Sequence, residues 1–179
     1  MFFQDTKMTL EQELKHDETY SLDFNDIRRI IQGRAYGMTM GFVDLEENPD
    51  TTVEKALQGK NCCAVLCTAV IQHHKQRHWS LILRNKKGIS YFESLGMGKK
   101  ITRIVHAPGF WASLAKHRAE FNTHRLQKNA KAITTCGLHI IVRAVKHEMS
   151  NQEYAHWLMS ARGLPDYTVA LLTHFGHKT

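Results

Sequence analysis

The chain has 179 residues, of which 42% are hydrophobic and 23% charged, and its formal net charge is +7. This length favours a single domain over residues 1–179, because a second independent core would be cramped. No stretch approaches the roughly 20 apolar residues of a membrane span, and the charged Asp5 and Lys7 argue against a signal peptide. We therefore expect a protein that is not secreted, does not bind membranes and keeps its cysteines reduced.

The N-terminal elements are predicted from spacing and capping residues. Apolar side chains at helical intervals indicate a helix over residues 21–31, which Gly33 would end. A short strand is expected over residues 41–45. Asp50 and Thr51 then offer caps for a short helix.

The middle of the chain predicts a sheet. Residues 62–71 form a continuous apolar run, as expected of a strand buried on both faces. Residues 79–84 alternate in polarity, residues 85–88 supply a turn, and residues 89–92 return as the partner strand. A further short strand is expected over residues 123–127. The sheet should therefore be mainly antiparallel.

The remaining elements are predicted to be helices. Pro108 suits the first turn of one helix, and apolar residues from Cys136 to Met149 form the buried stripe of another. Ser150 begins a third helix through a capping box, and Asp166 is expected to cap a last one. Helices before and after a mainly antiparallel sheet predict the α+β class. The chain then divides into a helical N-terminal part, a sheet and a helical C-terminal part: residues 1–60, 61–128 and 129–179.

Cys136 is the candidate nucleophile. The other cysteines, Cys62, Cys63 and Cys67, share an apolar run and are expected in the core. Cys136 instead begins a predicted helix, whose macrodipole and free N–H groups would lower the thiol pKa and favour the thiolate. Gly137 beside it would leave the backbone open to a substrate carbonyl. Taken alone, Cys136 is more simply explained as a buried structural cysteine.

A predicted hairpin supplies partners for this thiol. His78 stands before Trp79 at the start of one strand, and Glu93 ends the partner strand. Pairing around the turn would bring both side chains to the same end of the sheet. An activated cysteine needs an imidazole within hydrogen-bond reach, and the imidazole needs a group that fixes its tautomer. His78 is therefore the candidate general base, and Glu93 is the residue expected to orient it.

A zinc site is one rival interpretation of the same region. Its candidate ligands are Cys62, Cys63, Cys67, His73, His74 and His78. Adjacent cysteines of a strand point to opposite faces of the sheet, and no second pair has zinc-finger spacing. Zinc is therefore disfavoured.

The basic residues of the C-terminal half suggest another rival, a non-catalytic DNA-binding or scaffold protein. They alternate with apolar residues, and they are Lys99, Lys100, Arg103, Lys116, His117, Arg118, Arg125, Lys128 and Lys131. Such a surface suits a polyanion through the release of counterions from phosphates. A solubilising surface is the simpler explanation, because no recognisable nucleic-acid motif accompanies it.

Four short motifs carry a family resemblance. They are His78-Trp79, Tyr91-Phe92-Glu93-Ser94-Leu95-Gly96, Leu126-Gln127 and Thr135-Cys136-Gly137. In this order they resemble the adenain-like cysteine proteases, the family of the adenovirus maturation protease and its relatives in virophages, polinton-like elements and large DNA viruses. Proteases of ubiquitin-like modifiers share the order, and Glu rather than Asp is the choice on the adenain side. The resemblance runs from His78 to Val145, under half of the chain.

The resemblance implies a papain-superfamily-like fold in circularly permuted order, because His precedes Cys here. It implies Cys136 as nucleophile, His78 as base and Glu93 as the orienting group. Gln127 would donate its side-chain amide to the oxyanion hole beside the Cys136 N–H. Gln127 lies nine residues before Cys136, more than the family leads us to expect, and Asn129 is the alternative donor.

The function implied by the resemblance is that of a cysteine endopeptidase. Its substrates would be viral capsid and core precursor proteins, cut during virion maturation in the virion or in the host cytoplasm or nucleus. No cofactor would be required, although DNA or a peptide could act as an activator, and we expect a monomer. The alternative within enzymes is a deubiquitinase, or an isopeptidase for a ubiquitin-like modifier, that uses the same three residues.

Overall fold

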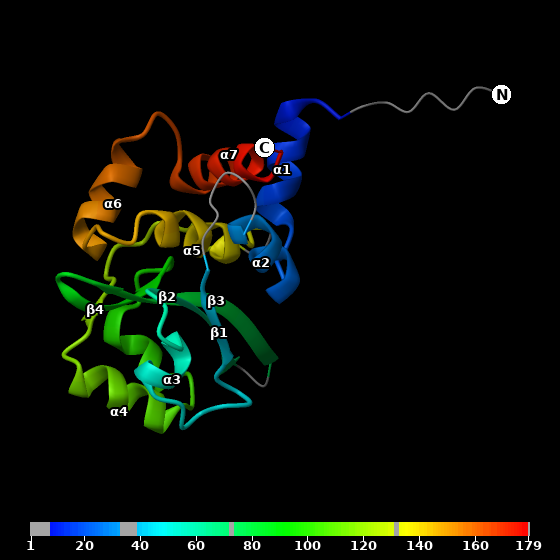
Figure 1. The fold of residues 1–179 in the computed structure, drawn as a ribbon. Coiled ribbons are helices and arrows are strands. Elements are labelled where there is room, and N and C mark those ends of the chain that lie inside the picture. Colours follow the sequence, from blue (N-terminus) through cyan, green and yellow to red (C-terminus); the bar gives the residue numbers. More distant parts are fainter. Residues whose placement is uncertain (1–7, 33–38, 72–73, 131–132, 179) are drawn as a thin grey trace.

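The computed structural model in Figure 1 describes residues 8–32, 39–71, 74–130 and 133–178. Its helices are α1 (Leu10–Thr19), α2 (Phe24–Gln32), α3 (Val53–Leu57), α4 (Pro108–Lys116), α5 (Cys136–Val145), α6 (Asn151–Ser160) and α7 (Pro165–Lys178), with a short 3-10 helix, η1 (Gly98–Arg103). Its strands are β1 (Gly41–Asp44), β2 (Cys62–Ile71), β3 (His74–Asn85), β4 (Gly88–Glu93) and β5 (Glu120–Phe121). The α+β class predicted from the sequence is confirmed.

The strands form one mixed sheet in the order β1-β2-β3-β4-β5. The two inner pairings, β2 with β3 and β3 with β4, are antiparallel, whereas both edge strands pair in parallel. The prediction of a mainly antiparallel sheet therefore holds for the long central pairings but misses the parallel edges. The N-terminal part is correspondingly not all helical, because it contributes β1 to the edge of this sheet.

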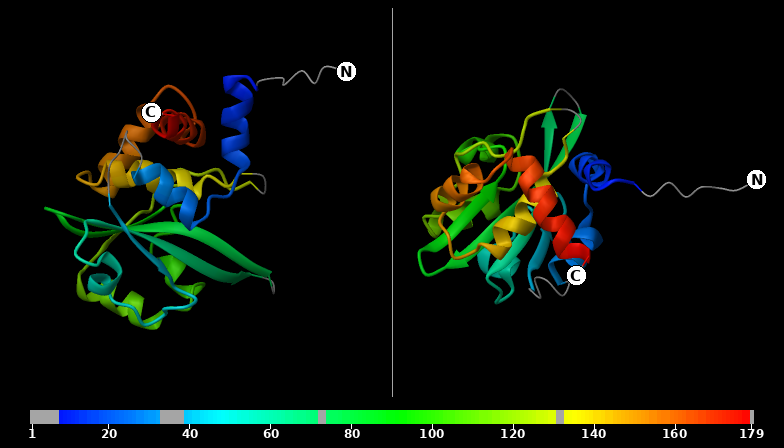
Figure 2. Two further views of the ribbon diagram at one scale, coloured as in Figure 1. Left: turned by 45° about the vertical axis from the view of Figure 1, so that its right-hand side comes forward. Right: turned by 90° about the horizontal axis from the view of Figure 1, so that it is seen from above.

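Helices cover both faces of the sheet. Figures 1 and 2 show α1, α2, α5, α6 and α7 on one side and α3 and α4 on the other. The apolar run of β2 serves both layers, because alternate residues pack on opposite faces. Cys62, Ala64 and Leu66 belong to the core under α5, whereas Cys63, Val65 and Cys67 belong to the core under α3 and α4. The predicted burial on both faces therefore holds for residues 62–67, whereas Val70 near the end of the strand is exposed.

Helix α5 packs between the sheet and α7, and a buried arginine forms hydrogen bonds at its C-terminal end. Arg143 is fully buried, and its guanidinium donates 2.7 Å hydrogen bonds to the carbonyl oxygens of Lys146 and Met149. These carbonyls lie beyond the helix, which ends at Val145 rather than at Met149 as predicted. A cation with charge-assisted hydrogen bonds is thereby placed at the negative end of the helix dipole.

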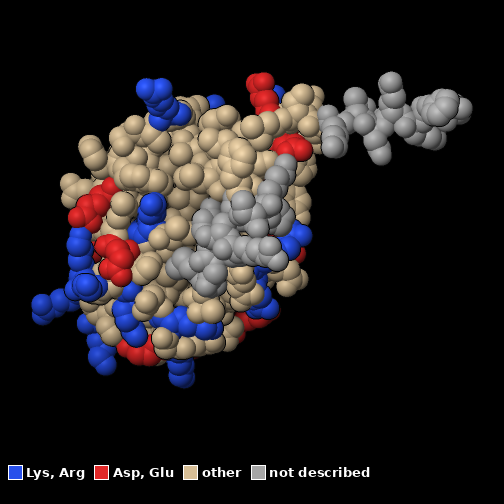
Figure 3. Space-filling view, turned by 45° about the horizontal axis from the view of Figure 1, so that its top comes forward, with Lys and Arg blue, Asp and Glu red and all other residues tan. Residues whose placement is uncertain are grey.

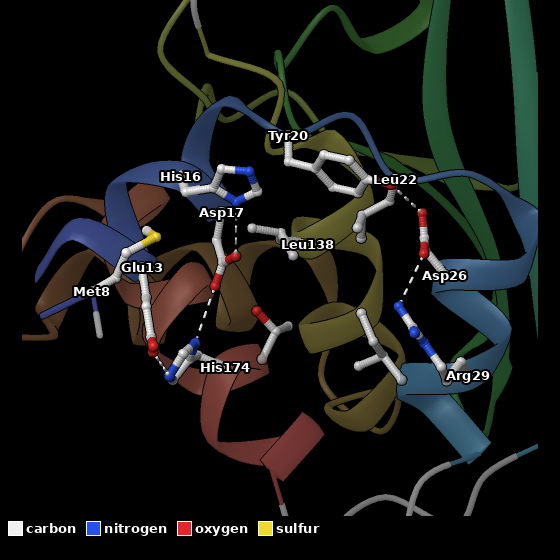
Figure 4. Close-up of a pocket in the computed structure, with 12 residues that line it drawn as sticks. Met8, Glu13, His16, Asp17, Tyr20, Leu22, Asp26, Arg29, Leu138 and His174 are labelled. Carbon is white, nitrogen blue, oxygen red and sulfur yellow. Dashed lines mark hydrogen bonds and ion pairs between the residues drawn. The ribbon is translucent and has the colours of Figure 1, made fainter. Parts of the chain in front are cut away.

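Helix α1 was not predicted, although Thr9 and Gln12 form a capping box at its start. Helix α1 contacts α7 through ion pairs with the buried His174. Figure 4 shows this ring between the carboxylates of Glu13 and Asp17, and each carboxylate lies 3.2 Å from one ring nitrogen. Because α1 is fixed in this way, the chain that follows it is held against the N-terminal end of α5.

Several predicted boundaries differ from the structure. Helix α3 follows Thr52, whose hydroxyl accepts the cap hydrogen bond, so neither Asp50 nor Thr51 is its cap. The predicted helix over residues 21–31 begins only at Phe24. Gly33, its expected stop, lies outside the described residues.

The strand predicted over residues 123–127 is wrong. Strand β5 lies just before it and pairs in parallel with β4. Asn122 then turns the chain out of the sheet, because its side-chain amide donates to the carbonyl oxygens of Glu93 and His124 at 2.6 and 2.9 Å. A local side-chain bond of this kind competes with the ladder of a sheet. Among the described residues, no helix is long and apolar enough to cross a membrane.

Candidate active site

The β3–β4 hairpin brings His78 and Glu93 together, as the sequence predicts. Ser80 pairs directly with Glu93, and His78 lies two residues earlier on the same face of β3. It is therefore the diagonal neighbour of Glu93, and its Nε2 lies 3.7 Å from Glu93 Oε2. His78 lies inside the strand rather than at its start, because β3 begins at His74 and is longer than predicted.

The Glu93 carboxylate is held rigidly. Its side chain is only 1% exposed. One of its oxygens accepts the backbone N–H of Leu95 at 2.8 Å, and the other accepts that of Met97. These bonds fix the carboxylate beneath the His78 ring, where an oxygen can still accept an imidazole N–H after a small movement. A separation of 3.7 Å suits an ion pair, and such contacts often tighten only when substrate binds.

Cys136 is the first residue of α5 and contacts His78. Burial by itself raises the pKa of this thiol, but the hydrogen bond from His78, the charge of His78 and the backbone N–H groups of Trp79 and Gly137 outweigh it, so that the pKa falls below its ordinary value of 9.0. Burial likewise lowers the pKa of His78, but Cys136 and Glu93 raise it to about 9. The lowered pKa of the thiol and the raised pKa of the imidazole both favour a thiolate–imidazolium pair over the neutral pair.

The pKa values of the other three cysteines are raised, whereas that of Cys136 is lowered. Burial raises the pKa of Cys62 and of Cys63 to about 12 and that of Cys67 to about 11. All four cysteines are free thiols. Only Cys136 therefore combines a lowered pKa with a neighbouring imidazole, and the three cysteines of β2 are core residues, as predicted.

Gln127 lies in the same cleft as Cys136 and His78. Its amide orientation is set by Ser94, whose hydroxyl donates to Gln127 Oε1 at 2.7 Å. The amide nitrogen donates to the carbonyl oxygen of Ile133 at 3.3 Å, which uses one of its two hydrogens. The geometry therefore presents the amide nitrogen, and not the oxygen, on the side of the cleft.

The cleft has a volume of about 620 Å³, and Asn129 also lines it. Asn129 is exposed, whereas Gln127 is buried and held by Ser94, so Gln127 is the better ordered of the two candidate donors. A smaller hollow of about 190 Å³ lies beside Cys136 and is lined by Leu22 and Trp79 among others. The cleft and this hollow both border Cys136, so a peptide could extend to either side of a bond placed next to the sulfur.

The segment after α1 explains why a glycine follows Cys136. A Cβ at Gly137 would meet the Leu22 side chain at 3.0–3.3 Å, closer than ordinary contact. Trp79 fixes this approach, because its indole N–H donates to the Leu22 carbonyl at 2.8 Å. The small size of Gly137 therefore admits Leu22, a role that the sequence did not predict.

The basic residues are exposed but are not part of this cleft as a group. Figure 3 shows Lys and Arg gathered over the lower half of one face, whereas the upper half is mostly free of them. The described members of the predicted basic set are exposed, except for the half-buried His117. Lys131 lies outside the described residues.

A metal site finds no support in the geometry. Within the described ranges, no group of three or more His, Cys, Asp or Glu side chains is arranged to hold a metal ion. Cys62 packs in one core and Cys63 and Cys67 in the other, so they could not converge on one ion. His73, one candidate zinc ligand, lies outside the described residues.

The rate of alkylation of Cys136 by iodoacetamide should report this electrostatics. Because its pKa is lowered, the rate should rise with pH to a midpoint below 9.0, and because the pKa of His78 is raised to about 9, the imidazolium should persist over that range. In His78→Ala the midpoint should move upward, since the neighbouring charge is lost. Mass spectrometry of the Cys136 peptide measures both rates. A wild-type midpoint at or above 9.0 would contradict the thiolate–imidazolium pair.

The residues at this cleft can act together on an acyl group. A thiolate can attack an acyl carbon, an imidazolium can donate a proton, a carboxylate can hold the imidazolium, and two N–H donors can stabilise an oxyanion. The second donor is the backbone N–H of Cys136, which has no acceptor within the helix because Cys136 is its first residue. The chain matches no protein-family model, and no curated protein matches it.

Proposed function

We propose that the protein is a cysteine endopeptidase with Cys136 as nucleophile. The observation that carries the proposal is the contact of Cys136 with His78, whose pKa is raised to about 9 while that of Cys136 is lowered. A cysteine that serves only the core has no reason to be ionised, and the three cysteines of β2 illustrate this. We further propose a papain-like arrangement in permuted order, with His78 and Glu93 preceding the nucleophile.

In the proposed reaction, the Cys136 sulfur attacks the carbonyl carbon of the scissile peptide. The negative charge moves to the carbonyl oxygen, which accepts hydrogen bonds from the Gln127 amide and the Cys136 N–H. His78 then donates its proton to the leaving amine, and the C–N bond breaks to leave a thioester. A water molecule gives its proton to His78 and attacks the thioester, which releases the acid and restores the thiolate. Glu93 stabilises His78 whenever the ring is charged.

The proposed substrates are viral capsid and core precursor proteins, with small residues such as Gly-Gly or Ala-Gly before the cut. The test is a panel of precursor-derived peptides against ubiquitin and ubiquitin-like C-terminal substrates. We expect hydrolysis of the peptides by the wild type and none by Cys136→Ala. Hydrolysis of the modifier substrates alone would make the protein an isopeptidase. No hydrolysis of either class, with an unreactive Cys136, would leave the non-catalytic alternative.

DNA is proposed as an accelerating partner of the same enzyme. The support is the net charge of +7 and the exposed basic residues that follow Lys99. Such binding would weaken steeply as salt is added. Hydrolysis that is indifferent to added DNA at low salt would count against this partner without affecting the proposed chemistry.

A further inference from the structure

Asp166 lies on α7, outside the cleft, yet its carboxylate contacts the frame of the proposed site. It is the second residue of α7 and only 7% exposed, and it is not the helix cap predicted from the sequence, since the helix begins at Pro165. Helix α7 packs on α5, so this end of α7 faces the start of the helix that carries Cys136.

The two oxygens of Asp166 bind three groups from two separate parts of the chain. Oδ2 accepts the backbone N–H of Lys128 at 2.8 Å. Oδ1 accepts the hydroxyl of Thr135 and lies 3.1 Å from Nε2 of His139. Lys128 directly follows Gln127, and Thr135 directly precedes Cys136.

We propose that Asp166 is a positioning residue that fixes the Gln127 donor relative to the Cys136 nucleophile. One carboxylate joins both ends of the chain segment between them. It therefore couples the position of the oxyanion donor to that of the sulfur, in addition to the bond by which Ser94 orients the Gln127 amide. His139 adds a third fixed point one turn into α5. The inference rests on the proposed function, because it assigns Asp166 a part in the same reaction.

The charge state of the cluster supports this role. Burial raises the pKa of Asp166, but hydrogen bonds from His139, Thr135 and Lys128 outweigh it, so the pKa lies below its ordinary value and the carboxylate is ionised. Burial lowers the pKa of His139, although Asp166 opposes this, so its ring is neutral and donates through Nε2. The carboxylate thus offers acceptors on both oxygens, and each is used.

An amide reproduces this pattern only if its partners rearrange. In Asp166→Asn, one oxygen remains as acceptor, and the NH₂ group would face the N–H of either Lys128 or the Thr135 side. With the oxygen toward the Lys128 N–H, the NH₂ group is accommodated only if the Thr135 hydroxyl accepts instead of donating and His139 changes tautomer. The charge-assisted character of these bonds is lost in either orientation, so the two ends of the segment are held less firmly. A displacement on the order of 1 Å at a catalytic donor can cost about 100-fold in rate.

The competing explanation is that Asp166 only stabilises α7, because acidic residues favour the first turn of a helix. This explanation predicts a lower melting temperature and an activity that follows the folded fraction. The positioning role predicts that fully folded protein loses more in kcat than it changes in KM, because an oxyanion donor acts on the transition state more than on the bound substrate. Alkylation of Cys136 should also be little changed, because its contacts with His78 do not pass through Asp166.

The experiment measures kcat, KM, the alkylation rate and the melting temperature of four variants. Asp166→Asn should lower kcat about 100-fold, with KM and alkylation within about 3-fold of wild type. Thr135→Val, which removes one hydroxyl, should lose about 10-fold in kcat, and Thr135→Ser, which keeps it, should be clearly more active than Thr135→Val. Asp26→Asn is the matched control, because it removes a first-turn carboxylate from α2 and should keep the wild-type kcat.

The possible results distinguish a positioning role of Asp166 from a purely structural one. Folded Asp166→Asn with wild-type kcat, or with a loss that only follows the unfolded fraction, would overturn the inference. If Asp166→Asn does not fold, the Thr135 pair decides, and equal kcat in the valine and serine variants would overturn it. A wild-type protein that neither hydrolyses peptides nor reacts at Cys136 would instead mean that the proposed function itself has failed.

Discussion

Replacing Cys136 with alanine is expected to abolish peptide hydrolysis while leaving the fold intact. In the proposed mechanism the Cys136 sulfur is the attacking atom and forms the covalent intermediate. Removing the nucleophile of a comparable hydrolase costs on the order of 10⁶-fold in kcat. Cys136 is 8% exposed and lines the cleft, and the substitution removes only one sulfur atom, so the loss of stability should be small. Activity against peptides and a thermal melt measure the two halves of the prediction.

Cys62→Ala is the matched control for this variant. It removes the same thiol from a fully buried site where the pKa is raised to about 12, so it should cost about 1–2 kcal/mol of stability and leave kcat unchanged. Activity that survives in Cys136→Ala, or that disappears equally in both variants, is the result that the proposed mechanism cannot accommodate.

Replacing Glu93 with glutamine should give the second-largest loss. The neutral amide no longer stabilises the imidazolium of His78, and the loss of an equivalent carboxylate in a serine protease costs about 10⁴ in kcat. Stability should fall as well, by about 1–3 kcal/mol, because the single remaining oxygen cannot accept both the Leu95 and the Met97 N–H. Steady-state kinetics on the folded fraction separates the two effects.

A pH titration identifies the cause of the Glu93→Gln effect. Glu93 raises the pKa of His78, so its removal should lower that pKa and move the alkylation midpoint of Cys136 to higher pH. Glu120→Gln is the control, because Glu120 is an exposed carboxylate on the adjacent strand β5 and should change neither kcat nor the midpoint. A wild-type kcat in Glu93→Gln would remove Glu93 from the proposed mechanism.

The parts of the fold that were predictable are those that local patterns determine. The apolar run of β2, the turn between β3 and β4 and the capping box at Ser150 each specify their element, and each is present. The hairpin also determines which face His78 and Glu93 share, because a strand alternates its side chains with a period of two. The proximity of His78 and Glu93 therefore follows from the register of the β3–β4 hairpin.

The parts that were missed depend on distant side chains. The end of α5 is set by the Arg143 guanidinium, and the turn that replaces the predicted strand is set by Asn122, whose partner Glu93 is far away in sequence. The role of Gly137 depends on Leu22 in the same way. Asp166 was predicted to be a helix cap because acidic residues are common at that position. Only the packing of α7 on α5 brings its carboxylate to Lys128 and Thr135 beside the proposed site. No local pattern encodes such contacts.

The central claim is that Cys136 is a thiolate activated by His78, and labelling with limiting iodoacetamide at about pH 6.5 tests it most directly. At that pH an ordinary thiol is almost entirely protonated and reacts slowly. We expect one modification per chain, mapped by mass spectrometry to Cys136, slowed strongly in His78→Ala and absent in Cys136→Ala. Equal modification of all four cysteines, or none at Cys136 while the wild type is folded, would contradict the claim.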